Sequence, residues 1–153
     1  MLSKPLTDYC HKLLRIGVQQ LGLPLGIVSR VYNGNYQIIA INSAAGVLKE
    51  GAVFPIGQTY CREVVQTGQV VTLTEIDGVR GLKKQPLYIR MPLEAYISAP
   101  IFHDGVVWGT INFTSMQIRP PFRATDIECV TQLADHIASY LDQMEAPRGY
   151  GAA

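Results

Sequence analysis

Apolar residues recur at three- and four-residue steps near the start of the chain, which is the spacing of one face of an α-helix. The segment runs from about Leu6 to Leu21, and Gly17 interrupts its stripe and weakens the middle. Gly22 and Pro24 follow, and both residue types commonly close helices. We therefore predict an amphipathic helix here. Its apolar stripe consists of Leu6, Tyr9, Cys10, Leu13, Leu14 and Leu21.

A second helical pattern follows Pro120 and Pro121 near the end of the chain. Thr125 and Glu128 have the spacing of a capping box, in which a hydroxyl and a carboxylate bind free backbone N–H groups of the first turn. The predicted stripe of this helix is Ile127, Val130, Leu133, Ala134, Ile137, Leu141 and Met144. We expect one domain over residues 1–146, followed by a flexible tail over residues 147–153.

Two dipeptides mark tight turns between apolar runs. Asn33-Gly34 and Asp104-Gly105 are residue pairs that supply the positive φ angles of tight hairpin turns, so each predicts a β-hairpin. The paired strands would be Gly26–Tyr32 with Tyr36–Asn42, and Tyr96–Phe102 with Val106–Thr114.

The strands of the later hairpin each have an apolar and a polar face, because side chains alternate along a strand. A strict two-residue turn would put the two apolar faces on opposite sides of the sheet. We therefore expect a three-residue loop, His103-Asp104-Gly105, with Gly105 as the left-handed residue of a bulge. The apolar face, which suits the terminal helices, consists of Ile97, Ala99, Ile101, Val107, Ile111 and Phe113. The polar face consists of Tyr96, Ser98, Thr110, Asn112 and Thr114.

The segment between the hairpins has mixed character. Thr59–Thr67 is predicted to be a short helix closed by Gly68, and Val70–Leu73 a short strand. Gly78–Glu94 is predicted to be a loop with a short helix around Leu87, and so long an irregular stretch is often a binding loop. The order of elements predicts an α+β fold, with an antiparallel sheet that the terminal helices cover on one face and the mixed segment on the other.

Composition excludes several function classes. The chain has 153 residues, of which 48% are hydrophobic, and its formal net charge of +1 gives no electrostatic case for nucleic acid or a membrane surface. Only 16% of the residues are charged, so we expect a partner or another domain to cover part of the surface. No apolar run is long enough to cross a bilayer. The three cysteines are widely spaced, which indicates neither disulfides nor zinc and favours a reducing cytoplasm.

Certain strings, together with the order of elements, resemble the GAF domain over roughly Leu6 to Met144. Phe54–Cys61 is similar to the stretch before the middle helix of GAF modules from bacterial sensor kinases and diguanylate cyclases. Tyr96–Ile101 and Trp108–Phe113 are similar to their paired late strands, and Phe122–Asp126 with Glu128 to the opening of their last helix. The resemblance implies a sensory domain that binds a small molecule, or a spacer that only dimerises.

Specific GAF subfamilies fit less well. Free methionine sulfoxide reductases place a cysteine at the point matching Cys61, but they also need a catalytic cysteine in the segment matching Gly81–Pro92, which has none. Their acidic ligands would fall at Tyr96, Asn112 and Thr114, which are not acidic. We therefore expect no enzymatic activity, and Cys61 is interpreted as a small core thiol, with a redox or nucleophilic role as the alternative.

Chromophore and cyclic-nucleotide subfamilies also depart from this sequence. Bilin-binding GAF domains typically have histidine after the attachment cysteine, whereas Arg62 follows Cys61. Cyclic-nucleotide-binding GAF domains have a signature that ends in Phe, three residues, then Asp-Glu; Phe122 and Asp126 fit, but Ile127 replaces the Glu. The cofactor therefore stays unknown, and the separate histidines indicate no metal site.

The candidate ligand site is the polar strand face beneath the Gly78–Glu94 loop, with two tyrosines and a cysteine at its side. The site residues are Tyr60, Cys61, Tyr88, Tyr96, Ser98, Thr110, Asn112 and Thr114. The set contains no carboxylate, so a neutral or anionic ligand is expected. A basic run in the loop could capture an anion or form a solvated face; it consists of Arg80, Lys83, Lys84 and Arg90.

Three functions stay open at this point. The first is a small-molecule sensor that forms a homodimer through its terminal helices, with an output domain or protein partner. The second is a structural dimerisation module whose pocket is packed shut by Tyr60, Tyr88 and Met91. The third is a thiol-based reductase.

Overall fold

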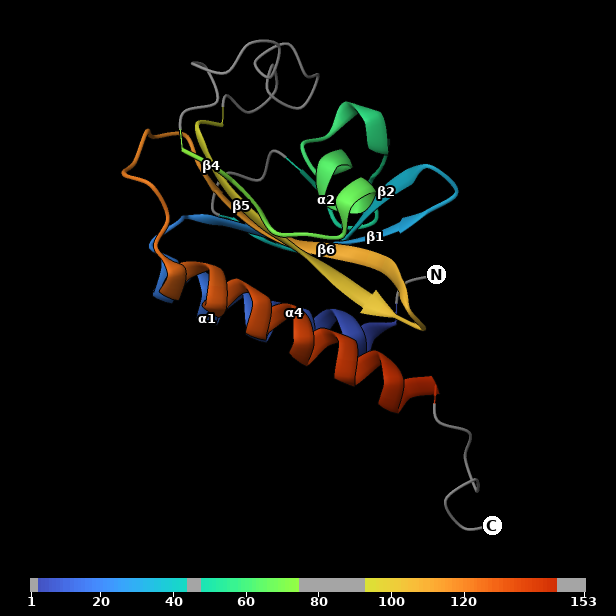
Figure 1. Cartoon of the computed structure of the whole chain (residues 1–153). Helices are drawn as coiled ribbons and strands as arrows, with labels where there is room; N and C mark the ends of the chain where they lie inside the picture. The colour runs from blue at the N-terminus through green and yellow to red at the C-terminus, as the bar shows by residue number, and fades with distance from the viewer. Residues whose placement is uncertain (1–2, 44–47, 75–92, 146–153) are drawn as a thin grey trace.

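A computed structural model describes residues 3–43, 48–74 and 93–145. These residues form an antiparallel sheet of six strands in the order β3-β2-β1-β6-β5-β4. Helices α1 and α4 lie side by side on one face of the sheet, and α2 lies on the other (Figure 1). The predicted α+β architecture is therefore confirmed.

The strands and helices have the following bounds. The strands are β1 Leu25–Tyr32, β2 Asn35–Asn42, β3 Val53–Pro55, β4 Val71–Leu73, β5 Ala95–His103 and β6 Val106–Ser115. The helices are α1 Lys4–Leu21, the 3₁₀ turn η1 Ile56–Gln58, α2 Arg62–Thr67 and α4 Ala124–Glu145. The predicted loop over residues 78–94 falls largely outside the described residues.

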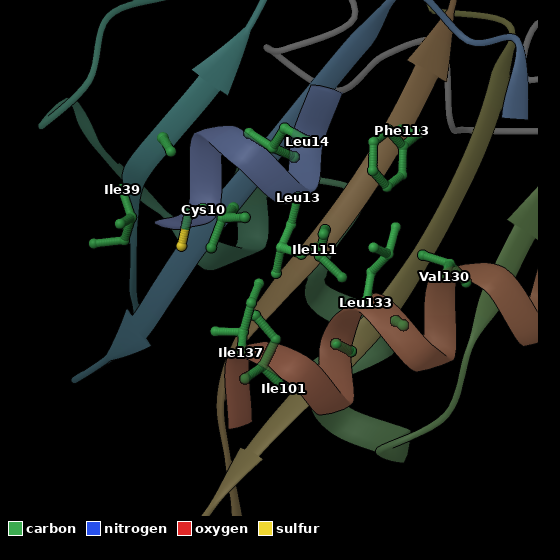
Figure 2. Packing of buried hydrophobic residues seen from close by; sticks show 14 of the residues in the cluster. Cys10, Leu13, Leu14, Ile39, Ile101, Ile111, Phe113, Val130, Leu133 and Ile137 are labelled. Atoms are coloured by element: carbon green, nitrogen blue, oxygen red, sulfur yellow. The ribbon is translucent and has the colours of Figure 1, made fainter. Parts of the chain in front are cut away.

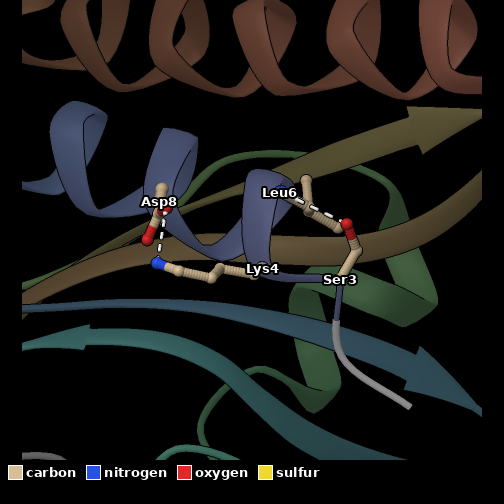
Figure 3. Close-up of polar contacts among 4 residues, drawn as sticks. All are labelled: Ser3, Lys4, Leu6 and Asp8. Atoms are coloured by element: carbon tan, nitrogen blue, oxygen red, sulfur yellow. Dashed lines mark hydrogen bonds and ion pairs between the residues drawn. The ribbon is translucent and has the colours of Figure 1, made fainter.

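Helix α1 begins at Lys4, two residues before the predicted start. The Ser3 hydroxyl accepts a hydrogen bond from the Leu6 backbone N–H at 3.4 Å, and Lys4 pairs with Asp8 at 3.0 Å (Figure 3). Gly22 ends the helix with a φ of 70°, a left-handed conformation that glycine adopts at low cost. Both ends of α1 are therefore set by local backbone chemistry.

The start of α4 differs from the prediction. The helix begins at Ala124, and the Asp126 carboxylate accepts a hydrogen bond from the Arg123 backbone N–H at 2.8 Å. Arg123 therefore precedes the helix as its cap, and Asp126 is the carboxylate three residues later that binds its backbone N–H. The predicted capping box of Thr125 and Glu128 is wrong. The ends of the predicted stripe are also exposed, since Ile127 and Met144 keep 37% and 45% of their surface.

The later hairpin has a two-residue turn, so the predicted three-residue loop is wrong. Asp104 and Gly105 have φ angles of 53° and 79°, and His103 pairs directly with Val106. The shift that aligns the faces comes instead from a bulge, because Ile101 pairs with Gly109 and Phe102 with Val107.

This bulge also changes which residue reaches the helices. Trp108 has no partner in the strand pairing and packs against the cluster beneath α1 and α4. Val107, which was predicted to belong to the apolar face, pairs with the exposed Phe102 and lies outside that cluster. The remaining predicted members of the face are all buried there, namely Ile97, Ala99, Ile101, Ile111 and Phe113.

The middle segment contains a shorter helix than predicted. Ile56–Gln58 forms a 3₁₀ turn, and Thr59 follows it in an extended conformation with φ −122° and ψ 159°. An extended residue cannot continue a helix, so α2 begins only at Arg62. Gly68 closes it as predicted, with a φ of 67°.

Two hydrophobic layers enclose the sheet. The larger lies between the sheet and the paired helices α1 and α4, and Figure 2 shows its side chains gathered between these elements. The smaller lies on the opposite face, where Cys61, at the start of α2, and residues of β1, β2 and β5 meet. Helices α1 and α4 thus lie on one side of the sheet, and the polar strand face belongs to the smaller layer.

Candidate ligand-binding site

The polar face of β5 and β6 is fully buried. Strand pairing places Tyr96 opposite Thr114 and Ser98 opposite Asn112, so these side chains share the face that is turned away from α1 and α4. Thr110 lies on the same face, opposite Pro100. All five predicted polar residues expose 2% of their surface or less. Sequence alternation therefore placed this group correctly.

A small cavity lies between this face and the start of α2. Its volume of about 10 Å³ suits roughly one water molecule. Apolar walls come from Leu25, Ile27 and Leu93. The polar lining comes from Tyr36, Thr59, Tyr60, Cys61, Tyr96, Asn112 and Thr114.

The Cys61 thiol is the centre of a buried hydrogen-bond cluster. Its sulfur lies 2.9 Å from the Tyr96 hydroxyl oxygen and accepts from Thr110 Oγ1 at 3.4 Å. Asn112 Nδ2 donates both to the sulfur, at 3.4 Å, and to the Tyr36 hydroxyl, at 3.3 Å. Ser29 Oγ lies 2.7 Å from Thr110 Oγ1. One cluster therefore joins α2 to strands β1, β2, β5 and β6.

Burial keeps this cluster uncharged at neutral pH. Burial raises the pKa of the Cys61 thiol above its ordinary value, although hydrogen bonds from Thr110 and Tyr96 partly oppose the shift. Burial likewise raises the pKa values of Tyr36 and Tyr96 well above 10. A neutral, fully packed thiol is a poor nucleophile, so burial lowers the reactivity of Cys61.

The structure brings together most of the predicted site. Tyr60, Cys61, Tyr96, Asn112 and Thr114 line the cavity, while Ser98 and Thr110 lie in the same buried layer. Tyr88 and the basic residues of the predicted loop lie outside the described residues.

Two polar residues of the first hairpin were missed. Tyr36 lines the cavity, and Ser29 lies opposite Thr110 in the pairing of β1 with β6. The sequence contained a sign of Ser29, because this polar residue interrupts an apolar run on the same face of β1 as Leu25 and Ile27. Within the described residues, no group of histidine, cysteine and acidic side chains could hold a metal ion.

A second depression, at the surface between α1 and β2, is lined by His11, Arg15, Ile41, Asn42 and Ser43. Its volume is about 250 Å³ and it is open to solvent. His11 is paired with the Glu50 carboxylate, which offsets the positive charge that the depression would otherwise present. Its charge and shape therefore give no ligand signal comparable to the buried cluster.

Comparison with solved structures identifies the fold. The blue-light absorbing PixJ GAF domain of Thermosynechococcus elongatus superposes with a TM-score of 0.75 at 17% identity, over 92% of this chain and 87% of that one. The phycocyanobilin-bound GAF domain of a cyanobacterial phytochrome gives 0.72 at 18% identity, over 90% and 85%. The chromophore binding domain of Stigmatella aurantiaca phytochrome P1 gives 0.67 at 19%, over 86% and 52%.

Sequence comparison leads to the same family. The family model for the GAF domain matches residues 5–141, whereas no curated protein matches the chain. Within the described part of the chain, no helix is long and apolar enough to cross a membrane. Because the family model spans nearly the whole chain and the fold is that of solved GAF structures, this protein belongs to the GAF domain family.

Proposed function

We propose that this GAF domain is a sensory module that binds a small molecule beside Cys61 and catalyses no reaction. The observation that carries the proposal is Thr114 Oγ1, which lines the cavity, is buried and has no hydrogen-bond partner among the described residues. Buried hydroxyls are nearly always paired, so an unpaired one beside a cavity is expected where a bound molecule completes it.

The nature of the lining supports binding without chemistry. The described residues that line the cavity include no histidine, lysine or carboxylate, and burial raises the pKa of Cys61, Tyr36 and Tyr96 further from neutrality, which disfavours general acid–base catalysis there. The raised pKa of Cys61 removes the thiolate that a thiol reductase would need. A sensory role is therefore favoured over the reductase alternative.

The bilin-binding structural neighbours support a small-molecule ligand, but the surroundings of Cys61 do not support a covalently attached bilin. One structural neighbour is a phycocyanobilin-bound GAF domain. In this chain, Cys61 is 2% exposed and hydrogen-bonded within the core, and Arg62 follows it. Covalent attachment would have to break that cluster, so we expect a ligand held without a covalent bond.

The small cavity favours the alternative of a structural module. Room for about one water molecule is too little for an organic ligand without displacement of neighbouring groups. A closed pocket would leave the domain to act as a dimerisation unit alone. The presence or absence of a bound ligand in the purified protein distinguishes the small-molecule sensor from the dimerisation module.

Native mass spectrometry of freshly purified protein is the test. We expect a non-covalent mass above that of the chain, lost on denaturation and absent from Asn112→Leu, which removes an amide that binds both Tyr36 and Cys61. Asn42→Leu, at the end of β2 and outside the cavity lining, is the matched control and should keep the mass. A mass that persists in both Asn112→Leu and Tyr96→Ala would place binding elsewhere. No bound mass in the wild-type chain would favour the structural module.

A homodimer through α1 and α4 is part of the proposal. The outer surface of α1 exposes Lys12 and Arg15, whereas α4 exposes Glu128, Asp135 and Asp142 at seven-residue intervals, along one line of the helix. A two-fold axis would bring α1 of each copy against α4 of the other, so the opposite charges would meet. An interface near ~1,600 Å² would suffice for a stable pair.

The position of the cavity offers a route for signal output, and the cysteines bear on the compartment. The cavity lies between β1, β2, β6 and α2, and β5 and β6 pack directly on α4, so ligand binding can alter the helix that would contact an output domain or partner. Cys10, Cys61 and Cys129 are all free thiols, which fits a reducing cytoplasm.

A further inference from the structure

His103 joins the tip of the later hairpin to the end of α4 (Figure 1). It is the last residue of β5, and its Nδ1 lies 3.0 Å from Oδ1 of Asp142 on α4. Its Nε2 lies 3.5 Å from Oδ2 of Asp104, the first residue of the hairpin turn. The imidazole is only 10% exposed, whereas Asp142 and Asp104 are 68% and 78% exposed. A buried histidine therefore lies between two hydrated carboxylates.

The protonation state of His103 changes both contacts. A protonated imidazole carries a hydrogen on each nitrogen, so it presents a donor to each aspartate. A neutral imidazole carries only one hydrogen, and in either tautomer the other nitrogen leaves a lone pair beside a carboxylate. Loss of the proton therefore weakens one contact and removes the attraction between opposite charges at the other.

The last turn of α4 has no positive charge of its own. Residues 142–145 include Asp142 and no basic residue. The partial negative charge at the C-terminal end of a helix disfavours an anion there and favours a cation. In the described contacts, the charged groups against His103 are Asp142 from α4 and Asp104 from the turn, and its strand partner Val106 is apolar. A protonated His103 would therefore compensate Asp142 and hold the last turn against the sheet.

We propose that His103 is a pH-sensitive latch, which fastens the last turn of α4 to the hairpin tip when it is protonated and releases it when it is neutral. Histidine side chains ordinarily change charge between about pH 5 and 8. Both contacts favour the protonated form in the folded chain, so the latch is complete at the acidic end of this range and is lost as the pH rises. None of its residues lines the cavity beside Cys61, so the latch does not depend on a bound ligand.

Hydrogen exchange of the α4 amides, corrected for the intrinsic effect of pH on exchange, tests the latch. In the wild-type chain we expect the amides of Tyr140, Leu141 and Asp142 to be about fivefold more protected at about pH 5 than at about pH 8, because a partly exposed charged contact contributes on this scale. Strong protection of the Val130 and Leu133 amides, in the middle of α4, establishes that a variant is folded.

Three variants assign this step in protection, because the chain has three histidines. His103→Gln cannot take up a proton and should remove the step. His136→Gln, at an exposed position of α4, and His11→Gln, on α1 beside Glu50, are the matched controls and should keep it. Asp142→Asn keeps an acceptor oxygen but removes the charge, so it should shrink the step. Because Asp142 is exposed, this variant tests the latch even if His103→Gln does not fold.

A wild-type chain without the step, or an equal step in folded His103→Gln or in Asp142→Asn, would overturn the latch. A step that disappears in His136→Gln or His11→Gln would belong to that histidine and would also overturn it. None of these outcomes changes the bound mass that tests the proposed function, so the two can fail separately.

Discussion

The Tyr96 hydroxyl and the Cys61 thiol lie 2.9 Å apart, although 35 positions separate them in the chain. The sulfur also accepts hydrogen bonds from Thr110 and Asn112, so it serves as a buried acceptor and not only as an apolar filler. This contact ties α2 to the central strands of the sheet.

The acceptor role of Cys61 predicts different costs for two substitutions. Cys61→Ala would leave the donors of Thr110 and Asn112 unpaired in the core, which should cost about 1–3 kcal/mol of unfolding free energy. Cys61→Ser keeps an acceptor atom and should cost about 1 kcal/mol or less. Urea denaturation of both variants measures the difference. Equal costs would mean that the sulfur contributes only by packing.

Stability should fall at alkaline pH. Burial raises the pKa of the Cys10 thiol from 9.0 to about 12. Between these values the unfolded chain loses the thiol proton while the folded chain keeps it, so unfolding becomes more favourable as pH rises, by up to ~1.4 kcal/mol per pH unit. Below pH 9 this thiol contributes no pH dependence.

Denaturant titrations at several pH values test this slope, with Cys10→Ala as the comparison. The variant should be less stable below pH 9 because of the cavity it creates, but its stability should decline less steeply above pH 9. Cys61, Tyr36 and Tyr96 act in the same direction and should leave a residual slope. Parallel curves for the variant and the wild type would refute the assignment to Cys10.

Gly17 should not tolerate a methyl group. A Cβ at this position would lie 2.1 Å from Cζ of Phe113, which is fully buried beneath α1. Alanine favours helix by about 1 kcal/mol, but overpacking at such a contact typically costs about 1–3 kcal/mol, so we expect Gly17→Ala to lower the melting temperature. Phe113→Leu should relieve part of this cost in the double variant. Gln19→Ala, on the exposed face of α1, is the control, and a rise in melting temperature for Gly17→Ala would contradict the packing argument.

Charge reversal tests the proposed dimer. Glu128→Lys with Asp135→Lys should weaken association, because each α4 would then present positive charge to Lys12 and Arg15 of the other copy. Adding Lys12→Glu and Arg15→Glu should restore it. Sedimentation equilibrium measures both effects, and Glu63→Lys on α2 controls for a charge reversal away from the terminal helices. A wild-type chain that stays monomeric at high concentration would exclude this dimer.

Local chemistry determined much of the fold. Asn33-Gly34 and Asp104-Gly105 form hairpin turns because few other residue pairs adopt positive φ at both positions. The apolar steps of the terminal helices and the alternation along β5 and β6 identified most of the buried side chains, since both depend only on the geometry of a single element. The shared polar face of Ser98 and Asn112 was predictable for the same reason.

Tertiary structure decided the connections between those elements. A bulge beside Trp108 takes the place of the expected three-residue loop. Either feature can bring the apolar faces of β5 and β6 to the same side of the sheet, so the choice between them depends on how Trp108 packs against the core. Asp126, not Glu128, caps the first turn of α4 because the helix begins two residues earlier than the local pattern indicated. The cluster of Tyr36, Cys61 and Tyr96 joins three distant segments, and the size of the cavity beside it depends on how closely those segments approach. Such contacts are set by packing over long sequence separations, which no pattern within one element records.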